Sequence, residues 1–89
     1  MPSGVCELGI ELWADRRGAG LGTDTIATLT AWLHANGFPR VQGGTDVRNA
    51  AMRRVFAKTG YVEEGVMRSF MPDGGGRSDF VLVAHVSER

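Results

Sequence analysis

The sequence predicts an α/β fold with a mixed sheet, in which the elements follow the order strand, helix, strand, helix, strand, strand. Apolar residues recur at alternate positions in 5–13, which is typical of a strand with one buried side. Two segments with helical spacing of apolar residues come next along the chain. A nearly continuous apolar run at 80–86 indicates a strand buried on both faces. We expect the first two strands to be parallel, joined by a right-handed crossover, and the final hairpin to extend the sheet antiparallel.

Capping signals set the expected bounds of the two helices. The first helix should begin at Thr23 or Asp24 and end at Asn36-Gly37, because an Asn-Gly pair favours a left-handed cap. The second helix should follow Asn49, since asparagine is a preferred N-cap residue. It should end just before Gly60, another left-handed cap signal.

The strands are expected between and beyond these helices. The alternation in the first strand places Cys6 on the apolar face and Glu7 on the opposite face. The second strand has a weak pattern and is assigned from its position between the two helices. The strands are expected at Val5 to Trp13, Arg40 to Thr45, Tyr61 to Phe70 and Phe80 to Val86, with a turn at Met71 to Ser78.

The composition fits one small globular domain spanning residues 1–89, with 43% hydrophobic and 22% charged residues. A formal net charge of zero without a long basic run argues against a dedicated nucleic-acid or membrane-surface binder. No apolar run approaches the roughly 20 residues that span a bilayer, and the N-terminus has no signal-peptide pattern. The single cysteine, Cys6, suits a reducing cytoplasm.

Metal binding is not expected. Cys6, His34 and His85 lack the spacing of metal ligands. We interpret the two histidines as surface or hydrogen-bonded residues.

A glycine-rich segment separates the first strand from the first helix. Glycines at 18, 20 and 22 would let the backbone approach an oxygen-rich group closely. The free amides and the positive dipole end of the helix N-terminus favour an anion at this position, and Arg17 adds positive charge. The segment therefore predicts a site for a phosphate-bearing ligand, although a tight connection that binds nothing has the same glycines.

Two familiar phosphate loops do not account for the segment. The Walker pattern fails because no Gly-Lys-Ser/Thr closes the loop. The dinucleotide fingerprint fits poorly, because the glycine spacing differs and the acidic residue expected about 20 positions further on is not evident near Val41.

The spacing Arg17-x-x-Gly20-x-Gly22 resembles the coenzyme A pyrophosphate loop of the GNAT superfamily of N-acetyltransferases. The segment at 49–61 is similar to the family's Asn-x-x-Ala-x-x-x-Tyr/Phe-x-Lys-x-Gly-Phe motif. The segments at 64–68 and 77–79 resemble the branch that acetylates ribosomal-protein N-termini and polyamines. Together these matches run from Val5 to Val86.

The resemblance implies that acetyl-CoA is the co-substrate and assigns roles to particular residues. The backbone at Leu12 and Trp13 would contact the pantetheine arm and help to polarise the thioester carbonyl. Asn49 would contact the pantetheine side of the coenzyme, and its role as a helix cap is an equally simple interpretation. The amides that would hold the pyrophosphate belong to Arg17, Gly18, Ala19, Gly20, Leu21, Gly22 and Thr23.

The resemblance also suggests the general base. Glu7 matches, by its position in the first strand, a glutamate that accepts the amine proton in several family members, often through water. Glu11 lies on the same face and is the second candidate. A solvent-facing strand carboxylate remains the alternative interpretation of Glu7. Phe56 stands where many family members have a tyrosine that protonates the departing thiolate. Phenylalanine has no proton to give, so the general acid is unidentified.

The matched motifs correspond to the coenzyme-binding, C-terminal half of the family fold. The implied function is acetyl transfer from acetyl-CoA to a primary amine, by direct attack in a ternary complex. The alternative is a coenzyme-A-binding or structural half-domain that assembles with a partner chain. We expect a homodimer or other oligomer that pairs through the Val5–Trp13 edge, because an uncovered strand edge templates pairing.

Overall fold

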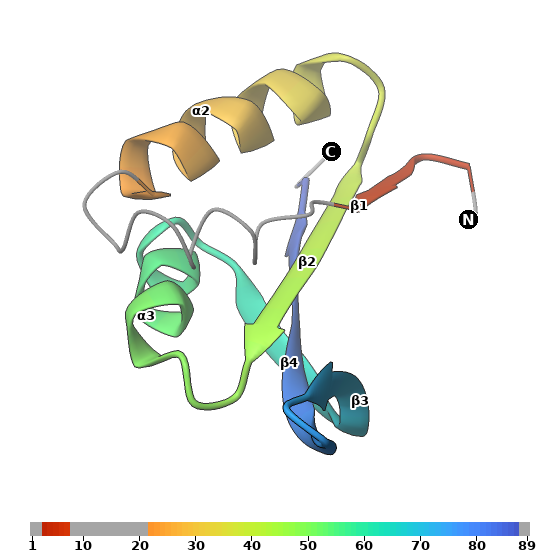
Figure 1. Cartoon of the computed structure of the whole chain (residues 1–89). Helices are drawn as coiled ribbons and strands as arrows, with labels where there is room; N and C mark the ends of the chain where they lie inside the picture. Colours follow the sequence, from red (N-terminus) through yellow and green to blue (C-terminus); the bar gives the residue numbers. More distant parts are fainter. Residues whose placement is uncertain (1–2, 8–21, 88–89) are drawn as a thin grey trace.

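The computed structural model of the chain describes residues 3–7 and 22–87. These residues form a four-stranded sheet and two helices (Figure 1). The elements are β1 (Val5–Glu7), α2 (Gly22–Ala35), β2 (Arg40–Asp46), α3 (Ala50–Lys58), β3 (Val62–Asp73) and β4 (Gly76–Val86). The expected order of strands and helices is confirmed.

The sheet is mixed, as the sequence predicts. Its strand order is β1-β2-β4-β3. β1 runs parallel to β2, with Val5 opposite Arg40, and β4 pairs antiparallel with both β2 and β3. This order places β2 beside the final hairpin, so the carboxyl end of β2 meets the tip of that hairpin.

The core joins both helices to the sheet through apolar side chains that are almost fully buried. Helical spacing brings Ile26 and Leu33 of α2 to the same cluster as three residues of α3. One residue of β2 and alternate residues of β4 also belong to it. The buried members from α3 and the strands are Met52, Val55, Phe56, Val41, Val81 and Val83.

The helix bounds agree with the capping signals to within one residue. α2 begins at Gly22, one position before the expected start. Gly37 has a φ of +97°, as a left-handed C-terminal cap requires. The Asn49 side chain accepts a hydrogen bond from the Met52 N–H at 3.0 Å, which confirms it as the N-cap of α3.

The final hairpin differs from the expectation. β3 continues to Asp73 and β4 begins at Gly76, so the predicted turn at Met71 to Ser78 is too long. The turn itself has positive φ at Gly74 and Gly75. The strands continue through most of the predicted turn because Met71 pairs with Ser78 after an irregular stretch.

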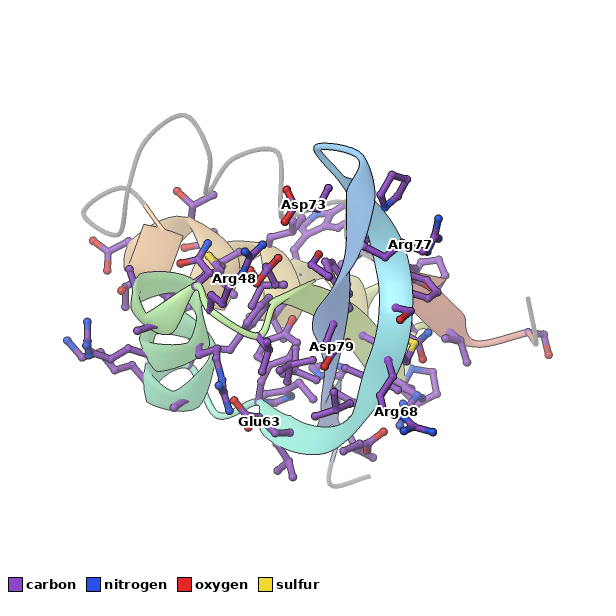
Figure 2. The ribbon with its side chains drawn as sticks, turned by 60° about the horizontal axis from the view of Figure 1, so that its bottom comes forward. Arg48, Glu63, Arg68, Asp73, Arg77 and Asp79 are labelled. Atoms are coloured by element: carbon purple, nitrogen blue, oxygen red, sulfur yellow. The ribbon has the colours of Figure 1, made fainter. Side chains whose placement is uncertain are left out.

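That irregular stretch is a bulge of three residues, Arg68 to Phe70, between the pairs Met67–Phe80 and Met71–Ser78. Ser69 has a φ of +55°, which side chains rarely adopt. Its N–H donates to Oδ1 of Asp79 at 2.9 Å. The Arg77 guanidinium donates to the carbonyls of Ser69 and Phe70 at 2.7 and 3.0 Å. Arg77 and Asp79, which make these contacts, both belong to β4 (Figure 2). These bonds satisfy backbone groups that the bulge removes from the ladder.

The predicted first strand is only partly tested. Residues 5–7 form β1, with Cys6 packed against the core and Glu7 exposed. Residues 8–13 of the predicted strand lie outside the described residues. Neither described helix is long and apolar enough to cross a membrane.

Candidate functional site

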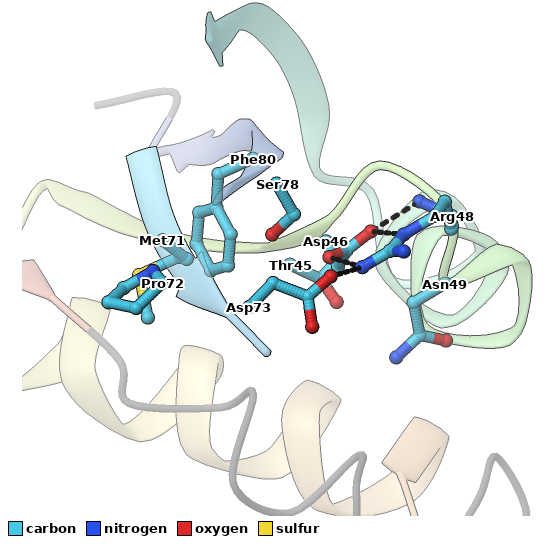
Figure 3. A pocket seen from close by; sticks show the side chains of 9 residues that line it. All are labelled: Thr45, Asp46, Arg48, Asn49, Met71, Pro72, Asp73, Ser78 and Phe80. Carbon is cyan, nitrogen blue, oxygen red and sulfur yellow. Dashed lines mark hydrogen bonds and ion pairs between the residues drawn. The ribbon is translucent and has the colours of Figure 1, made fainter. Parts of the chain in front are cut away.

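A cavity of about 410 Å³ opens where the carboxyl end of β2, the start of α3 and the tip of the β3–β4 hairpin meet (Figure 3). One part of its lining is polar and comes from the β2–α3 connection. The other part comes from the hairpin. The lining residues are Thr45, Asp46, Arg48, Asn49, Met71, Pro72, Asp73, Ser78 and Phe80.

Asn49 presents an amide donor at this cavity. Its side-chain oxygen accepts the capping bond from Met52, and its backbone N–H donates to the Asp46 carbonyl at 2.9 Å. The Nδ2 group has no acceptor among residues 3–7 and 22–87. One side chain can therefore cap α3 and still donate to a carbonyl group of a ligand.

The apolar wall of the cavity depends on a close approach between two strands. A Cβ at Gly44 would lie 2.6 Å from the Phe80 ring and 2.7 Å from the Val81 carbonyl oxygen. Only glycine leaves room here, so the Phe80 ring can lie over β2. Phe70 packs against Phe80 with ring centroids 5.5 Å apart.

Arg48 links two carboxylates at the polar side of the cavity. Its backbone N–H and its Nε each donate to Oδ1 of Asp46 at 2.8 Å. Its Nη2 donates to Oδ2 of Asp46 at 2.7 Å and to Oδ2 of Asp73 at 2.8 Å. Hydrogen bonds from Arg48 hold the pKa of Asp46 well below its ordinary range, and the two carboxylates raise the pKa of Arg48.

Glu7 lies on the exposed side of β1 and is hydrogen-bonded. Gln42, its neighbour on β2, donates Nε2 to Oε1 of Glu7 at 3.0 Å. Gln42 in turn accepts from Nε of Arg40 at 2.9 Å, and Arg40 pairs with Glu64 at 2.7 Å. The arginine lowers the pKa of Glu64 through its hydrogen bonds.

Glu7 and the Asn49 cavity are not brought together. Glu7 sits beside Gln42, four residues before Asp46 at the cavity. At about 3.3 Å per residue, this corresponds to about 13 Å along β2. A proton from a group bound at the cavity would need water to reach Glu7.

Most of the predicted coenzyme loop lies outside the described residues. The loop residues outside the described ranges are Arg17, Gly18, Ala19, Gly20 and Leu21. Glu11, Leu12 and Trp13 of the predicted first strand also lie outside the described residues. Gly22 and Thr23 are the first two residues of α2. Amides of a first helical turn lack partners within their own helix, so this end of α2 fits an anionic group.

Two aromatic residues of the family motif belong to the core. Phe56 is 1% exposed, which agrees with its interpretation as a core side chain without a proton to donate. The Tyr61 hydroxyl shares a buried hydrogen bond of 2.6 Å with Oγ1 of Thr30. Burial raises the pKa of Tyr61, so its hydroxyl gives up a proton less readily than that of an exposed tyrosine.

The histidines are hydrogen-bonded residues, as expected. Nδ1 of His34 lies 2.7 Å from the Phe38 carbonyl, and Nε2 lies 2.9 Å from Nδ1 of His85. Within the described ranges, no group of three His, Cys, Asp or Glu side chains could hold a metal ion.

Sequence reasoning did not single out Asp46, Arg48 or Asp73. The local spacing Asp46-x-Arg48 is compatible with the bonds that the structure shows. No comparable signal connects Asp73, because it is 25 residues from Arg48 and lies in a segment predicted to be a turn.

Residues 1–62 match the family model of the acetyltransferase (GNAT) domain. Because this match covers more than half of the 89 residues, the chain belongs to the GNAT acetyltransferase family. None of the curated proteins matches the chain by sequence.

Solved structures of acetyltransferases share the fold. The ribosomal-protein-S5-alanine acetyltransferase from Vibrio fischeri has a TM-score of 0.81 and 19% identity, over 99% of this chain and 49% of its own. The ribosomal-protein-S18-alanine N-acetyltransferase from Escherichia coli has a TM-score of 0.69 and 25% identity, over 84% and 49%. A spermidine N-acetyltransferase chimera from Vibrio cholerae and hSSAT has a TM-score of 0.73 and 16% identity, over 81% and 44%. The chain thus spans about half the length of these structures.

Proposed function

We propose that this chain binds acetyl-CoA and transfers its acetyl group to a primary amine. Family membership supports the coenzyme. The observation that carries the proposal is the position of Asn49, which caps α3 at the mouth of the cavity and keeps one amide donor available. The start of α2 at Gly22 supplies helix-end amides of the kind that bind phosphate.

In the proposed reaction, both substrates are bound in one ternary complex. The amine nitrogen attacks the thioester carbonyl carbon, a C–N bond forms, the C–S bond breaks, and coenzyme A leaves as a thiolate. Glu7, or alternatively Glu11, accepts the amine proton through water. Backbone amides at Leu12 and Trp13 stabilise the oxyanion. The proton donor to the thiolate is unassigned among these residues.

The proposed acceptor is either the N-terminus of a protein or a small polyamine. The names of the structural neighbours support these two classes, since these neighbours are named for acetylation of ribosomal-protein alanine and of spermidine.

We also propose a cytoplasmic location, on the basis of the single free cysteine.

A coenzyme-A-binding or structural half-domain without catalysis is the second candidate. The specific observation in its favour is that the chain spans only 49% and 44% of two of its neighbours. In this case coenzyme A binds, but acetyl transfer requires a partner chain.

Calorimetry with coenzyme A, followed by a thiol-release assay, separates these proposals. Spermidine and a short peptide that begins with alanine serve as acceptor probes. Binding with thiol release supports the enzyme, and binding without release supports the half-domain.

In the calorimetry, Gly20→Val should weaken coenzyme A binding at least tenfold, or about 1.4 kcal/mol, because a side chain would block the approach to phosphate. Equal affinity in a folded variant would contradict the phosphate-loop assignment.

We further propose that the chain forms a homodimer or another oligomer through the edge that includes β1. β1 lies at the end of the described strand order and pairs with β2, and such edges template pairing with another chain. Sedimentation at micromolar concentration tests this proposal directly, and a stable monomer would contradict it. Ile10→Lys should dissociate or unfold the oligomer, because it adds charge to a predicted apolar face of the strand.

A further inference from the structure

One wall of the Asn49 cavity is the last part of β3. Met71, Pro72 and Asp73 line the cavity and directly precede the two positive-φ glycines of the turn. This segment lies at the end of the molecule where the hairpin projects (Figure 1). Its position against the β2–α3 connection is therefore set by its own contacts rather than by the buried core.

The first set of contacts comes from β4. Asp79 accepts from the Ser69 N–H, and Arg77 donates to the carbonyls of Ser69 and Phe70. These bonds stabilise the three-residue bulge, after which Met71 pairs with Ser78. The bulge thereby sets the register of the cavity wall relative to β4.

The second contact crosses the cavity. Nη2 of Arg48 reaches Oδ2 of Asp73 at 2.8 Å while it also donates to Asp46 at 2.7 Å (Figure 3). Two further bonds, from the backbone N–H and Nε of Arg48, fix the same arginine on Asp46. Three bonds thus hold Arg48 on Asp46 at the end of β2, and a fourth joins it to the hairpin, immediately before the helix cap Asn49.

Stability does not explain this arrangement. The Arg48 side chain is 66% exposed and Asp73 is 47% exposed, and ion pairs with such exposure contribute little to the free energy of unfolding. The bonds do, however, restrict the distance between two walls of the cavity. The segment is already paired with β4, so the bond need only set the orientation of the hairpin tip relative to the β2–α3 connection. A small energy is sufficient for that.

We infer that Arg48 is a positioning residue of the acceptor site, which holds the hairpin tip Met71–Asp73 at a fixed distance from Asn49 through its bond to Asp73. This inference rests on the proposed acetyl transfer for its functional meaning. The bond between Arg48 and Asp73 shapes the side of the cavity formed by the hairpin, whereas Asn49 forms the side proposed for the coenzyme. Loss of the bond therefore affects acceptor binding more than coenzyme binding.

A matched pair of variants isolates the bond. Asp73→Asn removes the charge opposite Arg48. Glu63→Gln removes the charge opposite Arg53 in another surface ion pair with 2.8 Å bonds, in which the side chains are 36% and 43% exposed. This pair also joins the α3 region to β3. Glu63 and Asp73 lie near opposite ends of β3 (Figure 2), and Glu63 does not line the cavity.

Hydrogen exchange of the full chain provides a readout that does not depend on activity. In Asp73→Asn, the amides between residues 71 and 77, Pro72 excepted because it has no N–H, should exchange about threefold faster. Amides of the core strands should keep their rates. Glu63→Gln should leave the rates at 71–77 unchanged. Equal exchange at 71–77 in Asp73→Asn and the parent protein would overturn the inference.

Kinetics then tests the functional part with spermidine and an alanine-initiated peptide as probes. Asp73→Asn should raise the KM of the accepted probe about fivefold or more, because the wall of its site is less well positioned. Its acetyl-CoA affinity should stay within about twofold. Arg48→Gln should also raise the acceptor KM. Arg48→Lys keeps the charge but cannot bond both carboxylates in the same fork geometry, so it should recover only part of the acceptor binding that Arg48→Gln loses.

The outcomes separate the inference from the proposed function. Faster exchange at 71–77 with neither probe acetylated supports the structural role of Arg48 and counts against the proposed transfer by this chain. Measurable transfer with unchanged exchange, or with an unchanged acceptor KM, counts against the positioning role and leaves the proposed function intact.

Discussion

Gly22, the first residue of α2, lies directly against Val55 in α3: a Cβ on Gly22 would be 3.3 Å from Cγ1 of Val55. Val55 is itself 2% exposed and belongs to the core. The last glycine of the predicted phosphate loop therefore allows two helices to pack closely. Its presence in the sequence has a packing reason as well as the proposed ligand reason.

This contact predicts that Gly22→Val destabilises the protein by about 1–3 kcal/mol, because added methyl groups would overpack the junction of the two helices. Urea unfolding measures the change. Gly65→Val is the matched control, since a Cβ at Gly65 meets no atom within 4 Å and its φ is not in the left-handed region. Equal stability of Gly22→Val and the parent would show that the two helices can separate at no cost.

The two roles of Asn49 can be separated by its variants. Asn49→Ala removes the cap acceptor and should cost about 1 kcal/mol. Asn49→Asp keeps an oxygen for the Met52 N–H and should preserve stability, but it loses the Nδ2 donor and should weaken coenzyme A binding. Urea unfolding and calorimetry on the same samples give both values. Full affinity in Asn49→Asp would limit Asn49 to its role as a cap.

Glu7→Gln tests the proposed base. Glutamine retains an oxygen that can accept from Gln42, so the bond between β1 and β2 should persist. Turnover should fall by about 100-fold, with little change in coenzyme affinity, as expected for a group used in the chemical step.

Glu64→Gln is the control for this substitution, because Glu64 ends the same hydrogen-bonded chain but pairs with Arg40. It should keep the parent's turnover. Full activity in Glu7→Gln together with loss in Glu11→Gln would transfer the role of base to Glu11.

The sequence predicted those features of the fold that have local signals. Asn49 could be predicted as a cap because its hydrogen bond reaches only three residues ahead in the sequence. The Asn-Gly pair predicted the end of α2 because Gly37 adopts the positive φ that such a cap needs. The alternation that separates Cys6 from Glu7 likewise follows from the two-residue repeat of a strand.

The hairpin and its contact with Arg48 have no such signal. Ser69, rather than a glycine, adopts positive φ in the bulge, and it does so because Asp79 and Arg77 bond its backbone from the next strand. Asp73 meets Arg48 only after this bulge sets the register. Both depend on tertiary contacts, which local patterns do not encode.

The last prediction concerns pH and rests on the pair His34 and His85. The Phe38 carbonyl can only accept, so Nδ1 of His34 donates to it. In that tautomer, Nε2 of His34 accepts from Nδ1–H of His85. Burial and the neighbouring His34 lower the pKa of His85 below its ordinary 6.5. The Tyr61 ring lies edge-on at 5.4 Å, and Glu64 lines the same cavity as the two histidines.

A lowered folded-state pKa means that the unfolded chain binds a proton more readily than the folded chain. The free energy of unfolding should therefore fall as pH decreases through 6.5, and the loss should be complete below the folded-state pKa of His85. The paired carboxylates Asp46, Glu63 and Glu64 have ordinary pKa values of 3.8 to 4.5 that folding lowers. Their contribution is lost only at more acidic pH, so it does not overlap this window.

Urea unfolding at about pH 7.5 and about pH 5.5 measures this difference, because the ordinary histidine pKa lies between them. His85→Gln should be less sensitive to pH than the parent, since glutamine can still donate to Nε2 of His34 but does not titrate. The same sensitivity in both proteins would assign the effect to another group. Greater stability of the parent protein at the lower pH would contradict the direction of the His85 shift, because protonation would then favour the folded chain.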